Sequence, residues 1–486
     1  MFYKYKYYLL LSSLGLMFTG FQSVQAQNLS VSPSTQSKEY LISQNTTDQY
    51  NSSSNPLLFP TKPEEVEIDN TQSVTLVEAI EIALKNNQEL EGARLQLERS
   101  EASLNGFLAR ELPTINGQLE FNQRADDTPD VDGFTARDRT VLSGQIEVNY
   151  NVYDGGNREA NIARARRQLY SDQLEIERLS EQVRFDAGSA YYQLQNADAQ
   201  VAIAQAAIED FSQTLRDAKL LEQAGLGTRF DVLQAEVDLA NANQALTAAV
   251  SDQKNARRSL AEVLNVGEKI ELSAADEIQE NGVWEYSLEE SIVMAFKNRA
   301  ELEQLLVQRE INLQDREIAL SQTRPQVDLF ANYNFSNAFL DTFDNTGYAD
   351  GYNTGVRLNW LLFDGGESKE RAKEEEISAQ IDESNFSDQK NQIRLAVESA
   401  YNNLIANQEN IKTTEQAVVT AVESLRLARL RFQAGVGTQT DVINSQRALT
   451  EARGNFLQAI IGYNQSLNDL QRAVSNLPDN RLFDFN

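Results

Sequence analysis

The sequence predicts a mixed α/β membrane protein with an internal duplication. The expected assembly is a trimeric, twelve-stranded antiparallel β-barrel, with four strands per protomer, continued by a long α-helical coiled-coil barrel. Three observations predict this fold. Motifs of the first half return in the second half, the helical segments carry heptad repeats over spans free of proline, and each half contains two short segments that alternate apolar and polar residues.

The chain begins with a segment typical of a secretory signal peptide, residues 1–26. Two lysines precede the mostly apolar run 7–18, and Ala26 offers a small residue for cleavage. A short membrane anchor is the alternative, but the run is far below the ~20 residues that a spanning helix needs. Residues 27–72, rich in Ser, Asn, Gln, Thr and Pro, predict a mobile or extended lead-in.

Two repeats follow, predicted at 73–264 and 288–475, with a connecting lobe at 265–287 and a C-terminal tail at 476–486. The motifs of the first repeat return 210 or 212 positions later: Leu76–Leu90 as Leu288–Leu302, Pro113 as Pro325, Tyr153–Gly156 as Phe363–Gly366, and Ala224–Leu233 as Ala434–Ile443. Each repeat is therefore expected to contain a helix, two strands, a very long helix, a tip and a returning helix.

Strands are predicted at about 114–124 and 140–152, and again at 326–337 and 352–363, because apolar and polar residues alternate there with period two. Each has about the length that crosses a bilayer when tilted. The sequence places acidic residues in the expected loops (Asp126, Asp127, Asp130 and Asp132; Asp341, Asp344 and Asp350) and aromatic residues near the strand ends (Tyr150, Tyr153, Trp360 and Phe363). The alternative is a sheet whose apolar face packs on a soluble core, but the remaining segments offer little to cover it.

The long helices are expected at 157–223 and 367–433, each about 100 Å at the standard rise. Two stacked helices, at 229–264 and 288–323, would return over about the same length. In the other half, residues 439–474 and 76–111 would do the same. Apolar residues spaced by three and four follow these helices, which we interpret as packing seams.

Four strands cannot close a barrel, and open sheet edges do not survive in lipid. The smallest barrels of this kind use about eight strands. The chain is therefore expected to oligomerise, and three copies would supply twelve strands.

Composition excludes several functions. The chain has neither Cys nor His, which removes haem ligation, zinc fingers and nucleophile–base pairs built on these residues. Its formal net charge of −29 argues against nucleic-acid binding. We expect no cofactor, no metal site and no catalytic residue.

The two tips share the pattern Ala-Gly-x-Gly-Thr-x-x-Asp-Val. Both glycines of each tip are expected to accept the positive φ of a helix C-terminus. Thr228 is then expected as an N-cap with Asp231 three residues later, and Thr438 and Asp441 repeat the arrangement. Capping alone would explain these residues. Their position at the far ends of two long hairpins makes docking or gating the other interpretation.

Together, the duplicated helix entry, the paired Tyr/Phe-Asp-Gly-Gly turns and the paired tips resemble the TolC-type outer-membrane efflux and secretion channel family, over residues 74 to 475. The resemblance implies a homotrimer in the outer membrane, in contact with its lipid, with a helical tunnel across the periplasm. It also implies two partners, a periplasmic adaptor protein and an inner-membrane ABC or RND transporter.

The resemblance also implies roles for the tips. The adaptor-docking residues would be Gly225, Leu226, Gly227, Thr228, Gly435, Val436, Gly437 and Thr438. The pore gate would include Asp441 and, in the first hairpin, Asp231. One turn after Asp441, where the family can carry a second aspartate, this chain has Asn444, which predicts weaker block by cations.

The function expected from these features is a passive exit duct for multidrug efflux, type I protein secretion or both. The alternative is an exported structural coiled coil of the periplasm or cell surface, which would explain the heptads but not the strands. An enzyme is a third reading, but no motif singles out a pair of carboxylates.

Overall fold

The computed structural model describes residue 57 and residues 59–130, 133–341 and 346–475, with side chains left out for 126–137. We describe the unit Tyr50–Asn486 by itself. The predicted signal peptide, most of the lead-in, the C-terminal tail, Asp132 and Asp344 lie outside the described residues.

Helices and strands occur twice in the same order. The first repeat contains α2 (Leu76–Asn86), α3 (Gln88–Ala109), β2 (Thr114–Asp130), β3 (Gly133–Tyr153), α4 (Asn157–Gln223) and α5 (Arg229–Val263). The second contains α6 (Leu288–Asn298), α7 (Ala300–Ser321), β5 (Gln326–Asp341), β6 (Gly347–Asn359), α8 (Glu367–Gln433) and α9 (Gln439–Val474). A 3-10 turn η2 (Pro63–Glu65) and strand β1 (Asn70–Val74) precede them, and strand β4 (Ile270–Ala274) lies between them.

The long helices α4 and α8 have the bounds that the sequence suggests, but the shorter upper helices do not. Each segment expected to be one helix, 76–111 and 288–323, is two helices. The breaks are at Asn87 and Arg299, whose ψ angles of 123° and 110° are extended. The apolar pattern continues across both breaks, so periodicity did not reveal them.

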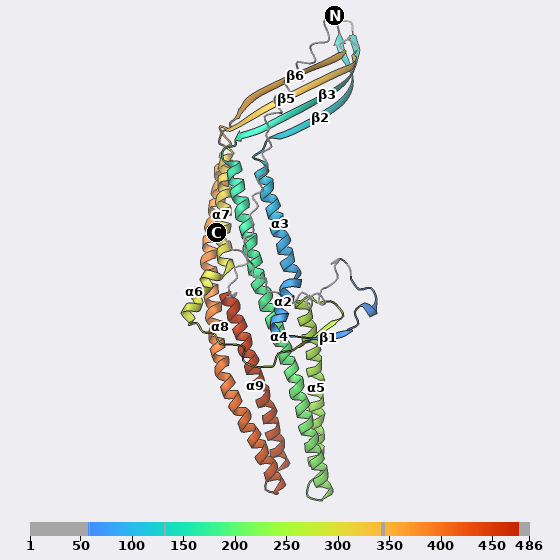
Figure 1. Ribbon diagram of the computed structural model, residues 1–486, viewed down its shortest axis with the longest axis vertical. Helices are drawn as coiled ribbons and strands as arrows, with labels where there is room; N and C mark the ends of the chain where they lie inside the picture. Colours follow the sequence, from blue (N-terminus) through green and yellow to red (C-terminus); the bar gives the residue numbers. More distant parts are fainter. Residues whose placement is uncertain (1–56, 58, 131–132, 342–345, 476–486) are drawn as a thin grey trace. The chain divides into compact units, whose positions relative to one another are not determined.

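The four strands form one antiparallel sheet in the order β2-β3-β5-β6 (Figure 1). β2, β3 and β5 extend beyond the predicted ranges, so Asp126, Asp127 and Asp130 lie in strand β2 rather than in a loop. Asp341 ends β5, and Asp350 lies in β6. Alternation marks only the part of a strand that has an apolar face, whereas the hydrogen-bonded ladder also continues through polar sequence.

The end of β6 also differs from the prediction. The strand stops at Asn359, so Trp360 and Phe363 follow it instead of belonging to it. The Trp360 indole donates a hydrogen bond to the Thr323 carbonyl at the end of α7 (3.1 Å), which fixes the chain as it turns toward α8.

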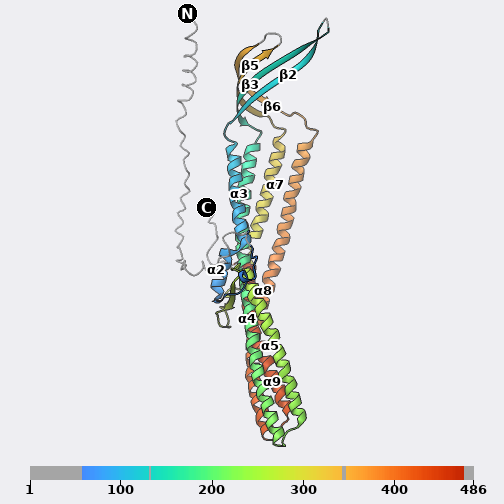
Figure 2. The ribbon, with the colours of Figure 1, turned by 90° about the vertical axis from the view of Figure 1, so that its right-hand side faces the viewer.

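One face of the sheet is apolar and exposed. Ile115, Leu119 and Phe121 of β2, and Val356 and Leu358 of β6, are exposed on it. Among the described elements, no helix covers either face, because α3, α4, α7 and α8 meet the sheet only at its end (Figures 1 and 2). A sheet packed on a soluble core therefore does not describe this unit.

Below the sheet, α3, α4, α7 and α8 lie side by side in that order, and the lower halves of α4 and α8 form antiparallel hairpins with α5 and α9 (Figure 1). The heptad stripes supply the hairpin interfaces. The first hairpin buries Val201, Ala204, Ala218, Val232, Ala235 and Ala249, and the second buries Leu425, Ala428, Val442 and Leu449. Along the described part of the chain, none of the helices combines the length and the apolar character that crossing a membrane requires.

A small lobe lies where the repeats meet. β1 and β4 pair in parallel, so Asn70–Gln72, expected in the lead-in, belong to a strand. The hydroxyl of the buried Tyr191 of α4 donates to the Asp276 carboxylate (2.8 Å) and also lies 3.2 Å from the Val74 carbonyl oxygen, which ties the lobe to the long helix. Composition did not suggest this pairing, because parallel strands are joined only through a long crossover.

Candidate gate at the hairpin tips

The first glycine of each tip ends the long helix. Gly225 and Gly435 have φ angles of 70° and 73°, a left-handed conformation that glycine adopts without strain. The next amide then folds back onto the helix: Leu226 N donates to the Leu221 carbonyl (2.9 Å), and Val436 N donates to the Arg431 carbonyl (3.0 Å).

The second glycine serves a different purpose from the one predicted. Gly227 and Gly437 are not among the residues with positive φ. A Cβ at Gly227 would instead lie 3.1 Å from Leu221 Cβ and from Glu222 N, and one at Gly437 would lie 3.1 Å from Arg431 Cβ. At these positions the turn passes close to the helix that it has just left, so a side chain would be crowded.

Both returning helices begin with the predicted capping box. Thr228 Oγ1 accepts a hydrogen bond from Asp231 N (3.2 Å), and Asp231 accepts one from Thr228 N (3.0 Å). Thr438 and Asp441 repeat these bonds at 3.2 and 2.9 Å. The hydrogen bonds from Thr438, with a smaller contribution from Arg431, lower the pKa of the exposed Asp441 carboxyl. Asp441 therefore carries its negative charge at neutral pH.

The apolar residues of the tips point to a partner. Leu226 is 80% exposed and Val436 is 69% exposed, each between the two glycines of its turn. Exposed apolar side chains at the end of a long hairpin do not stabilise the single copy, and contiguous ones commonly mark interaction sites.

Asp441 and Asn444 share the exposed side of α9. Their neighbours Val442, Ile443 and Gln446 are buried against α8 and α4. The two candidate gate residues thus lie one turn apart on the surface, and Asp231 occupies the matching cap of the first hairpin.

Close to the tips, the structure joins the two hairpins by polar contacts that the sequence analysis missed. Arg447 of α9 pairs with Asp238 of α5, and Arg429 of α8 pairs with Asp210 of α4 (3.0 Å). The buried Thr214 hydroxyl also donates to Gln446 Oε1 (3.0 Å). These partners lie more than 200 positions apart in the chain, so no local pattern brings them together.

The two ion pairs differ in strength. The Asp238 side chain is only 2% exposed and Arg447 is 55% exposed, whereas Asp210 and Arg429 both reach solvent. Loss of Arg447 would leave a buried carboxylate without its cation, which is costly, whereas exposed pairs contribute about 0–1 kcal/mol. The Asp238–Arg447 pair is therefore the main charged contact between the hairpins near the tips.

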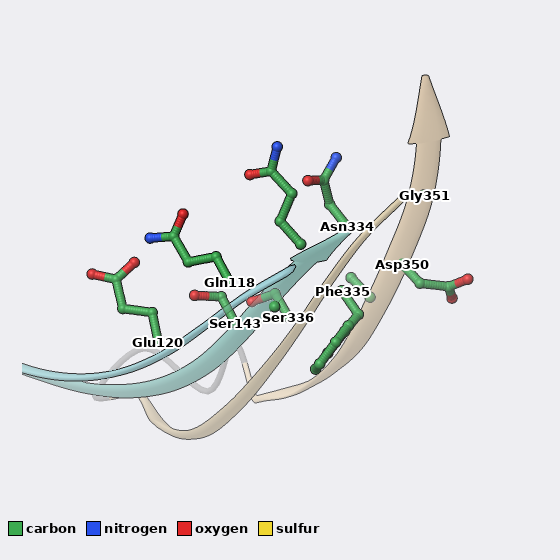
Figure 3. A pocket seen from close by; sticks show the side chains of 11 residues that line it. Gln118, Glu120, Ser143, Asn334, Phe335, Ser336, Asp350 and Gly351 are labelled. Atoms are coloured by element: carbon green, nitrogen blue, oxygen red, sulfur yellow. The ribbon is translucent and has the colours of Figure 1, made fainter. Parts of the chain in front are cut away.

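The polar face of the sheet forms a second candidate surface. A shallow cavity of about 370 Å³ is lined there by Gln118, Glu120, Ser143, Asn334 and Ser336. Figure 3 shows the Gln118 and Asn334 amides rising from one side of the sheet, with the Phe335 ring on the other side, where it covers Gly144. This face presents amides and hydroxyls to solvent, together with charged side chains such as Glu120 and Arg357.

Comparison with known proteins gives concordant matches. The family model described as outer membrane efflux protein matches residues 79–266 and 291–476. Outer membrane efflux protein BepC of Brucella suis is 25% identical over 394 residues, 80% of this chain and 82% of BepC. Outer membrane protein TolC of Vibrio cholerae is 27% identical over 172 residues, 35% and 39% of the two chains.

Two solved structures share the fold. A crystal structure of CusC superposes with a TM-score of 0.72 at 15% identity, covering 86% of this chain and 95% of CusC. The outer membrane protein VceC of Vibrio cholerae gives a TM-score of 0.68 at 20% identity, covering 82% and 95%.

Proposed function

Because this chain belongs to the outer membrane efflux protein family, we propose that three copies close their sheets into one twelve-stranded barrel in the outer membrane. The helices would continue the barrel as a tube into the periplasm. The assembly would act as a passive exit duct.

The observation that carries the proposal is the uncovered apolar face of the four-stranded sheet. In water such a face would aggregate, whereas in a bilayer it would contact lipid. Within the described sheet, β2 and β6 each pair on one side only, and further copies would satisfy their remaining backbone groups. Three copies would be enough to close a barrel.

The hairpin tips are the proposed docking site for a periplasmic adaptor. The exposed Leu226 and Val436 would supply apolar contacts, and the turns Gly225–Thr228 and Gly435–Thr438 would set their position. An inner-membrane ABC or RND transporter would then load the duct.

The same tips would form the gate. Asp441 and Asn444 would line the closed end, with Asp231 in the neighbouring hairpin, and contacts such as Asp238–Arg447 would hold the hairpins together. Docking of the adaptor would separate the hairpins and open the duct. A ring of ionised Asp441 carboxylates would favour cations at the entrance.

The polar face of the sheet fits the lining of a water-filled duct. Its amides and hydroxyls would let solutes pass without strong binding. This suits efflux of small molecules and type I secretion of unfolded protein alike.

Conductance across planar lipid bilayers tests the proposed function. Purified protein extracted with detergent is expected to give discrete channels, and the same preparation dissociated to monomers by heat is the control. A folded protein that salt alone removes from membranes, and that gives no channels, would contradict the proposal and favour a structural coiled coil.

A further inference from the structure

The two edges of the sheet, β2 and β6, can be matched to each other through the internal duplication. This inference rests on the proposed assembly, in which β6 of one copy pairs with β2 of the next. It concerns which residues then lie opposite one another.

The hydrogen-bonded ladders within one copy show that the duplication preserves strand register. Ile115 pairs with Val148 in the β2–β3 ladder. Adding 212 to the first number and 210 to the second gives Val327 and Leu358, which pair in the β5–β6 ladder.

A second pair obeys the same rule. Phe121 pairs with Leu142, and Tyr333 pairs with Tyr352. The offsets found in the sequence therefore describe strand pairing over at least this part of both hairpins.

The inner ladder between β3 and β5 has no counterpart within one copy. Its counterpart would join β6 of one copy to β2 of the next. In the inner ladder, Glu147 pairs with Asn332 and Val148 pairs with Ala331. Applying the same offsets, we propose that Arg357 of one copy lies directly opposite Glu120 of its neighbour, and Leu358 opposite Leu119. The barrel would then have three identical seams, each carrying one such ion pair on the polar face.

The side chains agree with this register. Glu120 and Arg357 have opposite charges and are both exposed in the single copy, and opposite charges facing each other across strands are stabilising. Leu119 and Leu358 are exposed on the apolar face. A slip by one residue would place Arg357 among the lipid-facing side chains. A slip by two would place it opposite the uncharged Gln118 or Asn122.

The helices below continue the same seam. Val307 of α7 is 4% exposed because it packs with Leu174 of α4 and Ile311. Its counterpart in the first repeat is Leu95 of α3, which is 57% exposed. Within one copy, α4 packs against Val307 of α7. If the same offsets apply below the sheet, α8 of a neighbouring copy packs against Leu95 of α3 in the same way. By the same offsets, the equivalent of Leu174 in α8 is Ser384, and the exposed Ile381 lies about one turn before it.

Disulfide trapping tests the register, since the chain has no native cysteine. The double variant Glu120→Cys with Arg357→Cys is expected to give covalently closed trimers under mild oxidation. The variant Glu147→Cys with Asn332→Cys should give a disulfide within one copy and no covalent trimer. The variant Gln118→Cys with Arg357→Cys, displaced by two residues, should crosslink much less, because diagonal neighbours are farther apart than a disulfide spans.

Charge reversal provides the second measurement. Glu120→Arg is expected to reduce the yield of detergent-stable trimer several-fold, and adding Arg357→Glu should restore it. Trimers that conduct but crosslink at 118–357 rather than 120–357 would overturn the register and leave the duct intact. Failure of the unmodified chain to form trimers would instead contradict the proposed function.

Discussion

The two places where an upper helix meets a returning helix occupy equivalent positions in the two repeats, yet their chemistry differs. In the second repeat, Arg299 and Arg472 both pair with the Glu301 carboxylate (2.7 and 3.1 Å) beside the buried Glu181 of α4. In the first repeat, the positions of the two arginines are taken by Asn87 and Glu262.

The first junction is built from polar and acidic side chains instead. Asn87 caps α3 by accepting a hydrogen bond from Leu90 N (2.8 Å), and a groove of about 500 Å³ lies between Asn87, Glu89, Asp186 and Glu262. Arg299 makes no such cap and instead donates to the Ala473 carbonyl at the end of α9 (3.3 Å). The two junctions therefore share the same helix break, but only the second has this largely buried ionic anchor for α9.

Breaking that anchor should have the largest effect on stability. Arg472→Ala leaves Glu301 with Arg299 alone and removes a cation from beside the buried Glu181. We expect a loss of about 3 kcal/mol, because the variant loses the hydrogen bonds that the Arg472 guanidinium donates to Glu301 and Gln182, and hydrogen bonds to charged groups contribute about 1.5–3 kcal/mol. The measurement is the denaturant midpoint for loss of helical circular dichroism. Glu262→Ala, at the matching position of the first repeat, should change stability by only about 0.5 kcal/mol. Equal losses of stability in Arg472→Ala and Glu262→Ala would show that the two junctions do not differ in strength.

Acid should weaken the second junction selectively. Burial alone would raise the pKa of Glu301, but the hydrogen-bonding Arg299 and the nearby Arg472 outweigh it and hold the pKa at about 2. Because this value lies below the ordinary 4.5, the stability that Glu301 contributes is present above pH 4.5 and is lost as the pH falls toward 2. Glu301→Gln should flatten the stability profile in that window. Glu89→Gln is the matched control, and a flattened profile there too would argue against the anchor.

The two ion pairs that join the hairpins near the tips also differ from each other, because Asp238 is buried and Asp210 reaches solvent. Arg447→Ala should separate the hairpins, because among the described residues the buried Asp238 carboxylate would keep a hydrogen bond from Gln234 (3.2 Å) but no cation. We expect higher basal conductance and a cost of about 1–3 kcal/mol. Arg429→Ala removes an exposed pair and should cost about 0–1 kcal/mol, with little change in conductance. The reverse order of the two conductances would contradict this ranking.

Local chemistry was predictable from sequence, and contacts between distant segments were not. Thr228 and Asp231 form their cap because the interaction spans three residues, and Leu119 and Phe121 share a face because strands have period two. The helix break at Asn87 had one available signal, since asparagine is a favoured N-cap. The break at Arg299 had no such signal, because arginine is not a favoured N-cap residue.

The missed contacts depend on tertiary placement. Asp238 and Arg447 are far apart in sequence, and neither carries a mark that distinguishes it from other surface charges. The β1–β4 pair likewise joins two short segments about 200 residues apart. The second tip glycine was assigned to the right turn but to the wrong cause, because a close approach of backbone is visible only in three dimensions.

The smallest predicted effect tests whether Asp441 takes part in the gate in addition to capping its helix. Asp231→Ala and Asp441→Ala each remove the acidic half of a capping box with nearly the same geometry, so the two variants should lose a similar, small amount of stability. If Asp441 also lines the pore, only Asp441→Ala should raise basal conductance or weaken block by multivalent cations. Single-channel recording of both variants separates the roles, because the shared loss of capping cancels in the comparison. Equal conductance and equal cation block in the two variants would reduce Asp441 to a helix cap and move the gate toward the Asp238–Arg447 pair.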